Sequence, residues 1–76
     1  MFPITDLEEG KASKVIEIIG GRGIHQKLDA FGIRVGVQVK KVSSLMLRGP
    51  VVITVGNTQI AIGRGMAQKI IVGFEK

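Results

Sequence analysis

Residues 51–62 read VVITVGNTQIAI, which is the pattern of a β-hairpin. Two runs rich in β-branched residues flank a Gly56-Asn57 loop, and two-residue loops of this composition are typical of tight hairpins. The loop sets a register in which three cross-strand pairs share one face: Val51–Ile62, Ile53–Ile60 and Val55–Thr58. A slip of one residue would turn Thr54 and Gln59 inward, so the pattern predicts that the odd-numbered positions of the first run face the core.

The segments outside the hairpin have strand character as well. Residues 37–42 alternate with a period of two for most of their length, and residues 14–19 and 70–74 are rich in β-branched side chains. The alternation within residues 14–19 is imperfect, so we expect that strand either to be buried on both faces or to contain a bulge. Together these segments predict a fold made mainly of short strands.

Residues 24–31 have the spacing of a helix instead. Ile24, Leu28 and Phe31 recur at positions that share one helical stripe, and Gly32 follows as a C-terminal stop. We therefore expect a short helix here, with Phe31 facing the core.

The N-terminal segment differs from the rest in charge. Residues 5–10 are expected to form one helical turn, capped by Thr5 or Asp6 and ended by Gly10. Residues 1–10 carry three acids and no base, net −3, whereas the rest of the chain carries eleven bases and three acids, net +8. A field of that sign favours an anionic partner, which is nucleic acid, a membrane surface or an acidic protein face.

The chain of 76 residues is expected to be a single domain, residues 1–76, with a mainly β fold. We predict a small SH3-like barrel of about five strands, with one short helix between the first two strands. The sheet is expected to close on itself as a barrel or to bury its open edges, because an exposed edge invites pairing with other chains. No cysteine is present, which excludes a disulfide scaffold and a cysteine-ligated metal site. No signal peptide or membrane-length apolar run is visible, so the expected location is the cytoplasm.

Catalytic and metal-binding patterns are sparse. His25 is the single histidine, and no nucleophile or acid–base motif accompanies it, so we expect no enzymatic activity. His25 and Asp29 are four residues apart on the predicted helix and would share a face, which is the start of a divalent metal site. The alternative is an exposed pair on a solvated helix face. The glycines of residues 20–23 match neither the Walker nor the dinucleotide pattern and favour a turn.

The basic residues leave nucleic-acid binding as an alternative. A phosphate-tracking surface would use Arg22, Arg34, Lys40, Lys41 and Arg48. Small barrels that bind single strands also need aromatic platforms, and this chain has neither Trp nor Tyr, which disfavours base stacking.

The segment before Gly49-Pro50 is unusual for a loop, because Leu45, Met46 and Leu47 are adjacent large apolar residues. Two interpretations stay open. The three side chains extend the preceding strand into the core, or they form an apolar loop that meets a partner or a second copy of the chain.

The order of several short motifs resembles the FeoA family, ferrous iron transport protein A, of small cytoplasmic SH3-like domains. The likeness runs from Ile4 to Val72 and rests on ITDLEEG at 4–10, GGRG at 20–23, Leu28 with FGIRVG at 31–36, GPVV at 49–52, IAIGR at 60–64, Met66-Ala67 and IIV at 70–72. Two positions depart from the family pattern: Arg34-Val35 stands where a proline usually precedes Gly36, and Ile62-Gly63-Arg64 stands where Leu-Arg is common.

The resemblance implies an accessory role in ferrous iron uptake, through binding to FeoB, a membrane transporter with a cytoplasmic GTP-binding domain. It implies protein recognition rather than catalysis, no small-molecule substrate, and no cofactor beyond a weakly bound divalent metal. A second interpretation is a regulatory domain related to the C-terminal domain of iron-dependent repressors, and a homo-oligomer also stays open. We predict docking through Leu45, Met46 and Leu47 by apolar contact and through Arg48, Arg34 and Lys41 by charge.

Overall fold

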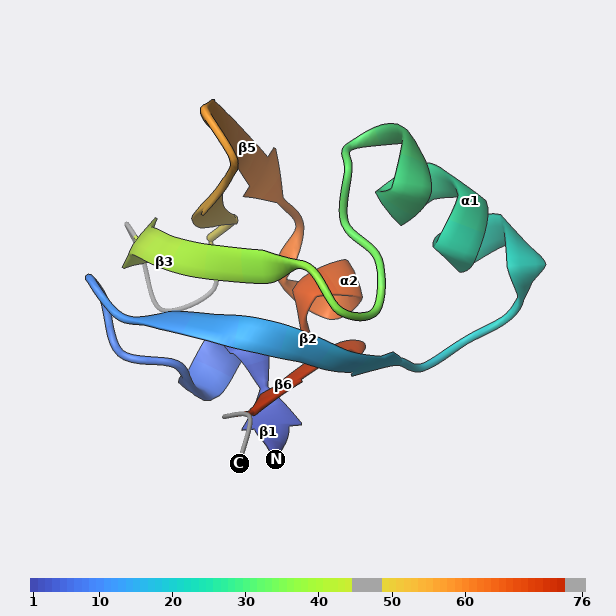
Figure 1. Ribbon diagram of the computed structural model, residues 1–76, viewed down its shortest axis with the longest axis horizontal. Coiled ribbons are helices and arrows are strands. Elements are labelled where there is room, and N and C mark those ends of the chain that lie inside the picture. Colours follow the sequence, from blue (N-terminus) through green and yellow to red (C-terminus); the bar gives the residue numbers. More distant parts are fainter. Residues whose placement is uncertain (45–48, 74–76) are drawn as a thin grey trace.

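The computed structural model describes residues 1–44 and 49–73 (Figure 1). Along the chain the elements are β1 (Phe2–Pro3), the 3₁₀ helix η1 (Ile4–Asp6), β2 (Ala12–Ile18), α1 (Arg22–Ala30), β3 (Gln38–Ser44), β4 (Val51–Val55), β5 (Thr58–Ile62), α2 (Arg64–Ala67) and β6 (Ile70–Gly73). The prediction of a mainly β fold with one short helix between the first two long strands is confirmed, and α2 adds a single turn before the last strand.

The strands of the described residues form one antiparallel sheet in the order β1-β6-β2-β3-β4-β5. This sheet has six strands rather than about five, because β1 is two residues long and too short to show an alternating pattern. The prediction of closure is wrong: β1 and β5 are the two ends of the sheet, and no ladder joins them in the part of the chain described. The short elements η1 and α2 pack against each other instead, and η1 also packs against β6.

The β4–β5 hairpin has the predicted register. Residue pairs across it include Val55 with Thr58, Ile53 with Ile60 and Val51 with Ile62. Gly56 adopts φ +60°, the left-handed conformation that tight hairpin turns require and that glycine adopts without strain. The odd-numbered positions of β4 face the core as predicted, with Val51 and Ile53 fully buried.

Strand β2 contains the bulge that its imperfect alternation allowed. Its register against β6 shifts between Val15 and Glu17. Val15 and Ile18 lie an odd number of residues apart, so in a regular strand they would face opposite sides of the sheet. Both are buried in the core, because the bulge changes the phase of the alternation between them.

The core is aliphatic throughout and lies between the sheet, α1, η1 and α2. Its buried members are Ile4, Leu7, Val15, Ile18, Leu28, Ile33, Val39, Val51, Ile53, Ile62, Ala67, Ile70 and Val72. Burial of this apolar surface is the main source of stability in a domain that has no disulfide.

Helix α1 is anchored by Leu28, which is fully buried, and ends in a Schellman motif. The N–H of Gly32 donates to the carbonyl of Asp29 and the N–H of Ile33 donates to that of Leu28, each at 2.9 Å. Gly32 has φ +84° and so allows the reversal. The prediction of Phe31 in the core is wrong: it caps the helix, is 43% exposed, and the buried Ile33 follows it.

The N-terminal turn lies earlier than predicted. The 3₁₀ helix η1 contains Thr5 and Asp6, so neither caps it, and its N-cap Pro3 has no side chain that could. The Nζ of Lys41 donates to the Thr5 carbonyl at 2.8 Å, and the N–H of Gly10 donates to the Lys41 carbonyl at 2.7 Å. Lys41 therefore ties the N-terminal segment to β3.

Candidate binding surface beside helix α1

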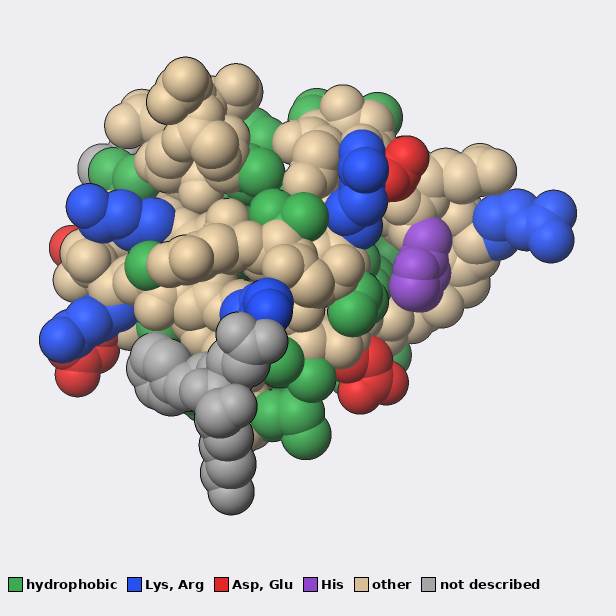
Figure 2. All heavy atoms as spheres, viewed as in Figure 1, with side chains coloured by type: hydrophobic (Ala, Val, Ile, Leu, Met, Phe, Trp, Pro, Cys, Tyr) green, Lys and Arg blue, Asp and Glu red, His purple; other side chains and the backbone are tan. Residues whose placement is uncertain are grey.

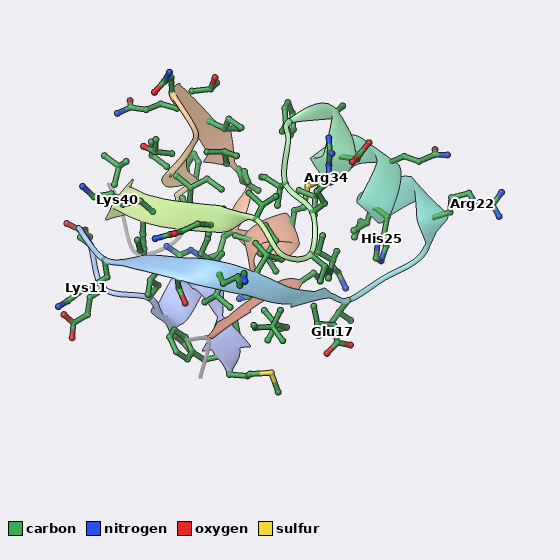
Figure 3. All side chains as sticks on the ribbon, viewed as in Figure 1. Lys11, Glu17, Arg22, His25, Arg34 and Lys40 are labelled. Atoms are coloured by element: carbon green, nitrogen blue, oxygen red, sulfur yellow. The ribbon has the colours of Figure 1, made fainter. Side chains whose placement is uncertain are left out.

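A shallow hollow opens between α1, the end of β2 and the loop that follows α1. Its volume is about 260 Å³, and it is lined by Ile18, His25, Gln26, Asp29, Ile33, Arg34 and Val35. Ile18 and Ile33 are buried core residues and make the floor apolar. Figure 3 shows His25 and Arg34 on the side of α1 that faces the rest of the molecule, and Figure 2 shows the histidine surface beside apolar and charged side chains.

An ion pair crosses the rim of this hollow. The Nε of Arg34 lies 2.7 Å from Oδ1 of Asp29, and the two side chains are 63% and 59% exposed. The pair forms because Gly32 turns the chain back along the helix, which returns Arg34 to the last turn of α1. Ion pairs this exposed contribute only about 0–1 kcal/mol, so a carboxylate from another molecule can replace Asp29 at small cost.

Exposed apolar side chains accompany the charges. Val35, 59% exposed, lines the hollow, and Phe31 caps the same helix with much of its ring in solvent. A hollow of about 260 Å³ is below the range of about 300–1,000 Å³ that is usual for small-molecule sites. The dimensions therefore suit a single side chain presented by another protein better than a complete small ligand.

The structure brings together residues that the sequence had assigned to separate roles. His25 and Asp29 were predicted as metal ligands and Arg34 as a docking charge, and all three line the same hollow. Sequence reasoning missed Ile33 and Val35. Both lie in the FGIRVG motif at 31–36, whose two glycines signal a loop, and the positive φ angles of Gly32 and Gly36 confirm that loop.

Two further predictions concern docking residues elsewhere. The prediction that Lys41 offers its charge on the surface is wrong, because Lys41 is 5% exposed and its ammonium group is bonded to the Thr5 carbonyl. The predicted contacts Leu45, Met46, Leu47 and Arg48 lie outside the described residues.

The predicted phosphate-tracking surface is not continuous. Lys41 is buried, and Figure 3 places Arg22 and Lys40 at opposite ends of the molecule.

The donor set for a metal ion at the hollow is small. His25 and Asp29 are exposed, and one Asp29 oxygen is already bonded to Arg34. Structural and catalytic metal sites use three or four protein ligands, and no group of three such residues gathers within residues 1–44 and 49–73. The residues present therefore do not fit a tightly held resident metal, and the two-ligand site stays a prediction of weak binding.

A second hollow has a mainly acidic lining. It measures about 310 Å³ and is lined by Phe2, Asp6, Leu7, Glu8 and Lys11, from the acidic N-terminal segment.

None of the helices in the described part is both long enough and apolar enough to cross a membrane.

These features define the class of protein. A small antiparallel sheet with an aliphatic core, one short helix and a shallow hollow with an apolar floor and a charged rim is the architecture of a small SH3-like domain. The FeoA domain matches residues 2–73 of the chain. The chain therefore belongs to the FeoA family of ferrous iron transport accessory proteins with an SH3-like fold.

Three known proteins illustrate the relationship. The Fe(2+) transport protein A of Methanocaldococcus jannaschii is 39% identical over 72 residues, which cover 95% of this chain and 85% of the relative. A crystal structure of an iron uptake regulatory protein (FeoA) superimposes with a TM-score of 0.86 at 32% identity and covers 95% of this chain and 93% of that one.

The third is the crystal structure of Stenotrophomonas maltophilia FeoA complexed with zinc, described as a procaryotic SH3 domain protein. Its TM-score is 0.80 at 19% identity, with 96% of this chain and 91% of that chain covered. At this identity the likeness shows the fold alone, and it confirms the predicted SH3-like architecture.

Proposed function

We propose that this chain is a non-enzymatic accessory protein of ferrous iron transport that binds the cytoplasmic side of a FeoB-type membrane transporter. Family membership and a curated relative named for Fe²⁺ transport support the role in ferrous iron transport. The observation that carries the binding role is the hollow beside α1, in which an apolar floor lies next to an exposed arginine.

The hollow suggests how a partner would be held. An apolar side chain of the transporter would rest on Ile18 and Ile33 and against Val35, which removes apolar surface from water. An acidic residue next to that side chain would accept hydrogen bonds from the Arg34 guanidinium and displace Asp29. Both contacts use groups that are already in place, so little conformational entropy is lost on binding.

The apolar segment Leu45–Leu47 with Arg48 remains a second predicted contact, on sequence grounds alone. Its contribution is separable by mutation from that of the hollow, because Met46→Asp changes only that segment.

The test is a binding titration of the purified protein against the purified cytoplasmic part of the transporter. Arg34→Glu should weaken binding by about tenfold or more, since it reverses the charge at the rim and repels the partner's carboxylate. Lys27→Glu is the matched control, because Lys27 is exposed on α1 and does not line the hollow. Equal affinity of the Arg34 and Lys27 variants would remove the hollow from the proposal, and undiminished binding by Met46→Asp would remove the 45–48 segment.

A weakly bound divalent ion at His25 and Asp29 is a separate part of the proposal, supported by the zinc complex of the Stenotrophomonas maltophilia protein. An ion that binds only the folded state raises the melting temperature by mass action. Ferrous or zinc ion should raise the melting temperature of the wild type, and His25→Ala should abolish the rise. Arg34→Ala should increase the rise, because it leaves Asp29 free to bind the ion. A melting temperature unaffected by either ion would contradict this part alone.

A further inference from the structure

The two ends of the sheet differ in how they are protected against pairing. Natural sheets shield an edge with a very short strand, a proline, a charged side chain or a bulge. Edge strand β1 has two of these devices, since it is two residues long and includes Pro3. Edge strand β5 is five residues long, reads TQIAI with no proline and no charge, and pairs with β4 without a bulge.

The hairpin register shows which backbone groups of β5 face outward. The pair that flanks a two-residue turn, here Val55 with Thr58, exchanges hydrogen bonds within the hairpin. Hydrogen-bonded and non-hydrogen-bonded pairs alternate in an antiparallel ladder, so Ile60 and Ile62 also bond to β4. The N–H and C=O groups of Gln59 and Ala61 therefore point away from the sheet.

These outward groups are accessible. Gln59 and Ala61 are both exposed, and neither has a backbone partner beyond the hairpin in the part of the chain that the structure describes. In Figure 1 the β5 arrow stands at the periphery of the molecule, away from both termini.

We infer that β5 is a pairing edge for a second copy of this chain, whose own β5 adds in antiparallel orientation. A two-fold axis would pass between the two Ile60 residues. Gln59 of each copy would then pair with Ala61 of the other copy. The two reciprocal pairs form four backbone hydrogen bonds, and they join the two sheets into one.

A second copy suits this edge because β5 is self-complementary. The chain carries net charge +5, which opposes association in general, but the absence of any charge on β5 removes like-charge repulsion from the contact itself. Ile60 is half-buried in the single chain, and in the pair it lies opposite the other Ile60 on the core side of the sheet, which buries both further.

The expected dimer is weak. Stable interfaces bury about 1,200–2,000 Å² in total, and one five-residue strand from each copy supplies only a part of that area. The dissociation constant should therefore lie between the micromolar and millimolar ranges, so the edge would act at high local concentration rather than hold a permanent dimer.

Sedimentation velocity over a concentration series tests the inference, with hydrogen exchange as the local readout. The wild-type sedimentation coefficient should rise with concentration, and the amides of Gln59 and Ala61 should become protected in the same range. Ala61→Pro removes the outward N–H, which takes no part in the β4 ladder, and should weaken association by at least about tenfold. Its circular dichroism spectrum and urea midpoint verify that the variant is folded.

A second pair of variants keeps the test independent of proline. Ala61→Lys places a charge on the edge, whereas Ala30→Lys adds the same charge at an exposed position on α1. The first should weaken association and the second should not. A wild type that stays monomeric at millimolar concentration, or Ala61 variants that associate like Ala30→Lys, would overturn the inference, and so would pairing of β5 with a segment of another protein in place of a second copy.

Discussion

The β4–β5 hairpin and helix α1 use their side chains in opposite ways. The hairpin directs one face toward the core, with Val51, Ile53 and Ile62 buried there. In α1, Leu28 is the single buried side chain, and most of the other residues are exposed. The hairpin therefore holds the fold, whereas α1 is attached through Leu28 and the partly buried Ile24 and presents polar side chains beside the hollow. Substitutions should separate these roles, with stability lost in the hairpin and binding lost near α1.

The largest difference is expected between core and helix truncations. Ile53→Ala should lower the free energy of unfolding by about 2–5 kcal/mol, because Ile53 is fully buried and its removal leaves a cavity. His25→Ala, at an exposed position on α1, should change it by no more than about 0.5 kcal/mol. Urea denaturation of both variants provides the comparison, and similar losses would contradict it.

The second-largest loss of stability is expected at the buried Lys41. Lys41→Met keeps most of the apolar stem but removes the ammonium group that donates to the Thr5 carbonyl, so we expect a loss of about 1–3 kcal/mol. Lys40→Met is the matched control, since Lys40 is the exposed neighbour on the same strand and should show little change. Chemical denaturation measures both, and equal stability of the two variants would show that the tie to the N-terminal segment contributes nothing.

At the end of α1, stability should depend on the backbone conformation of Gly32 rather than on steric crowding around it. Gly32→Ala should lower the free energy of unfolding by about 1–2 kcal/mol, because φ is +84° there. The added Cβ would itself make only an ordinary 3.6 Å contact with Val55. Gly23→Ala, within the same helix and facing open space, should instead stabilise the protein by up to about 1 kcal/mol. Thermal unfolding measures the change in melting temperature of each variant. A change of the same sign for the two variants would contradict this account of the helix end.

The ion pair at the rim should have the smallest effect on stability. Asp29→Asn removes the carboxylate charge that faces Arg34. The free energy of unfolding should fall by no more than about 1 kcal/mol, because both side chains are well exposed. The loss should shrink further at high salt. Denaturation at two ionic strengths measures it, and a loss as large as that of Ile53→Ala would mean that the loop after α1 belongs to the folding core.

The sequence predicts the hairpin better than the rest of the molecule, for a physical reason. A two-residue turn and strict alternation determine the register locally, so Val51, Ile53 and Ile62 are assigned to the core correctly. Strand β1 and the open ends of the sheet depend on contacts between distant segments, and a two-residue strand such as Phe2–Pro3 has no local signature.

The candidate site was predictable in part. Periodicity places His25 and Asp29 on one face of a helix, but it gives no indication that Arg34 returns to Asp29, because that contact depends on the turn at Gly32. Phe31 was misassigned because it lies at the helix end, where the backbone leaves the helical repeat. Lys41 follows the regular alternation of β3 onto the core side with Val39, and no local pattern shows that the Thr5 carbonyl lies there to accept its ammonium group.

Hydrogen exchange on the complex with the purified cytoplasmic part of the transporter tests the central claim most directly, with the protein kept dilute enough to be monomeric. If the hairpin is the scaffold and the α1 side is the contact surface, amides of residues 25–35 should gain protection on binding and those of β4 should not. Protection that appears in the hairpin and leaves residues 25–35 unchanged would contradict the account.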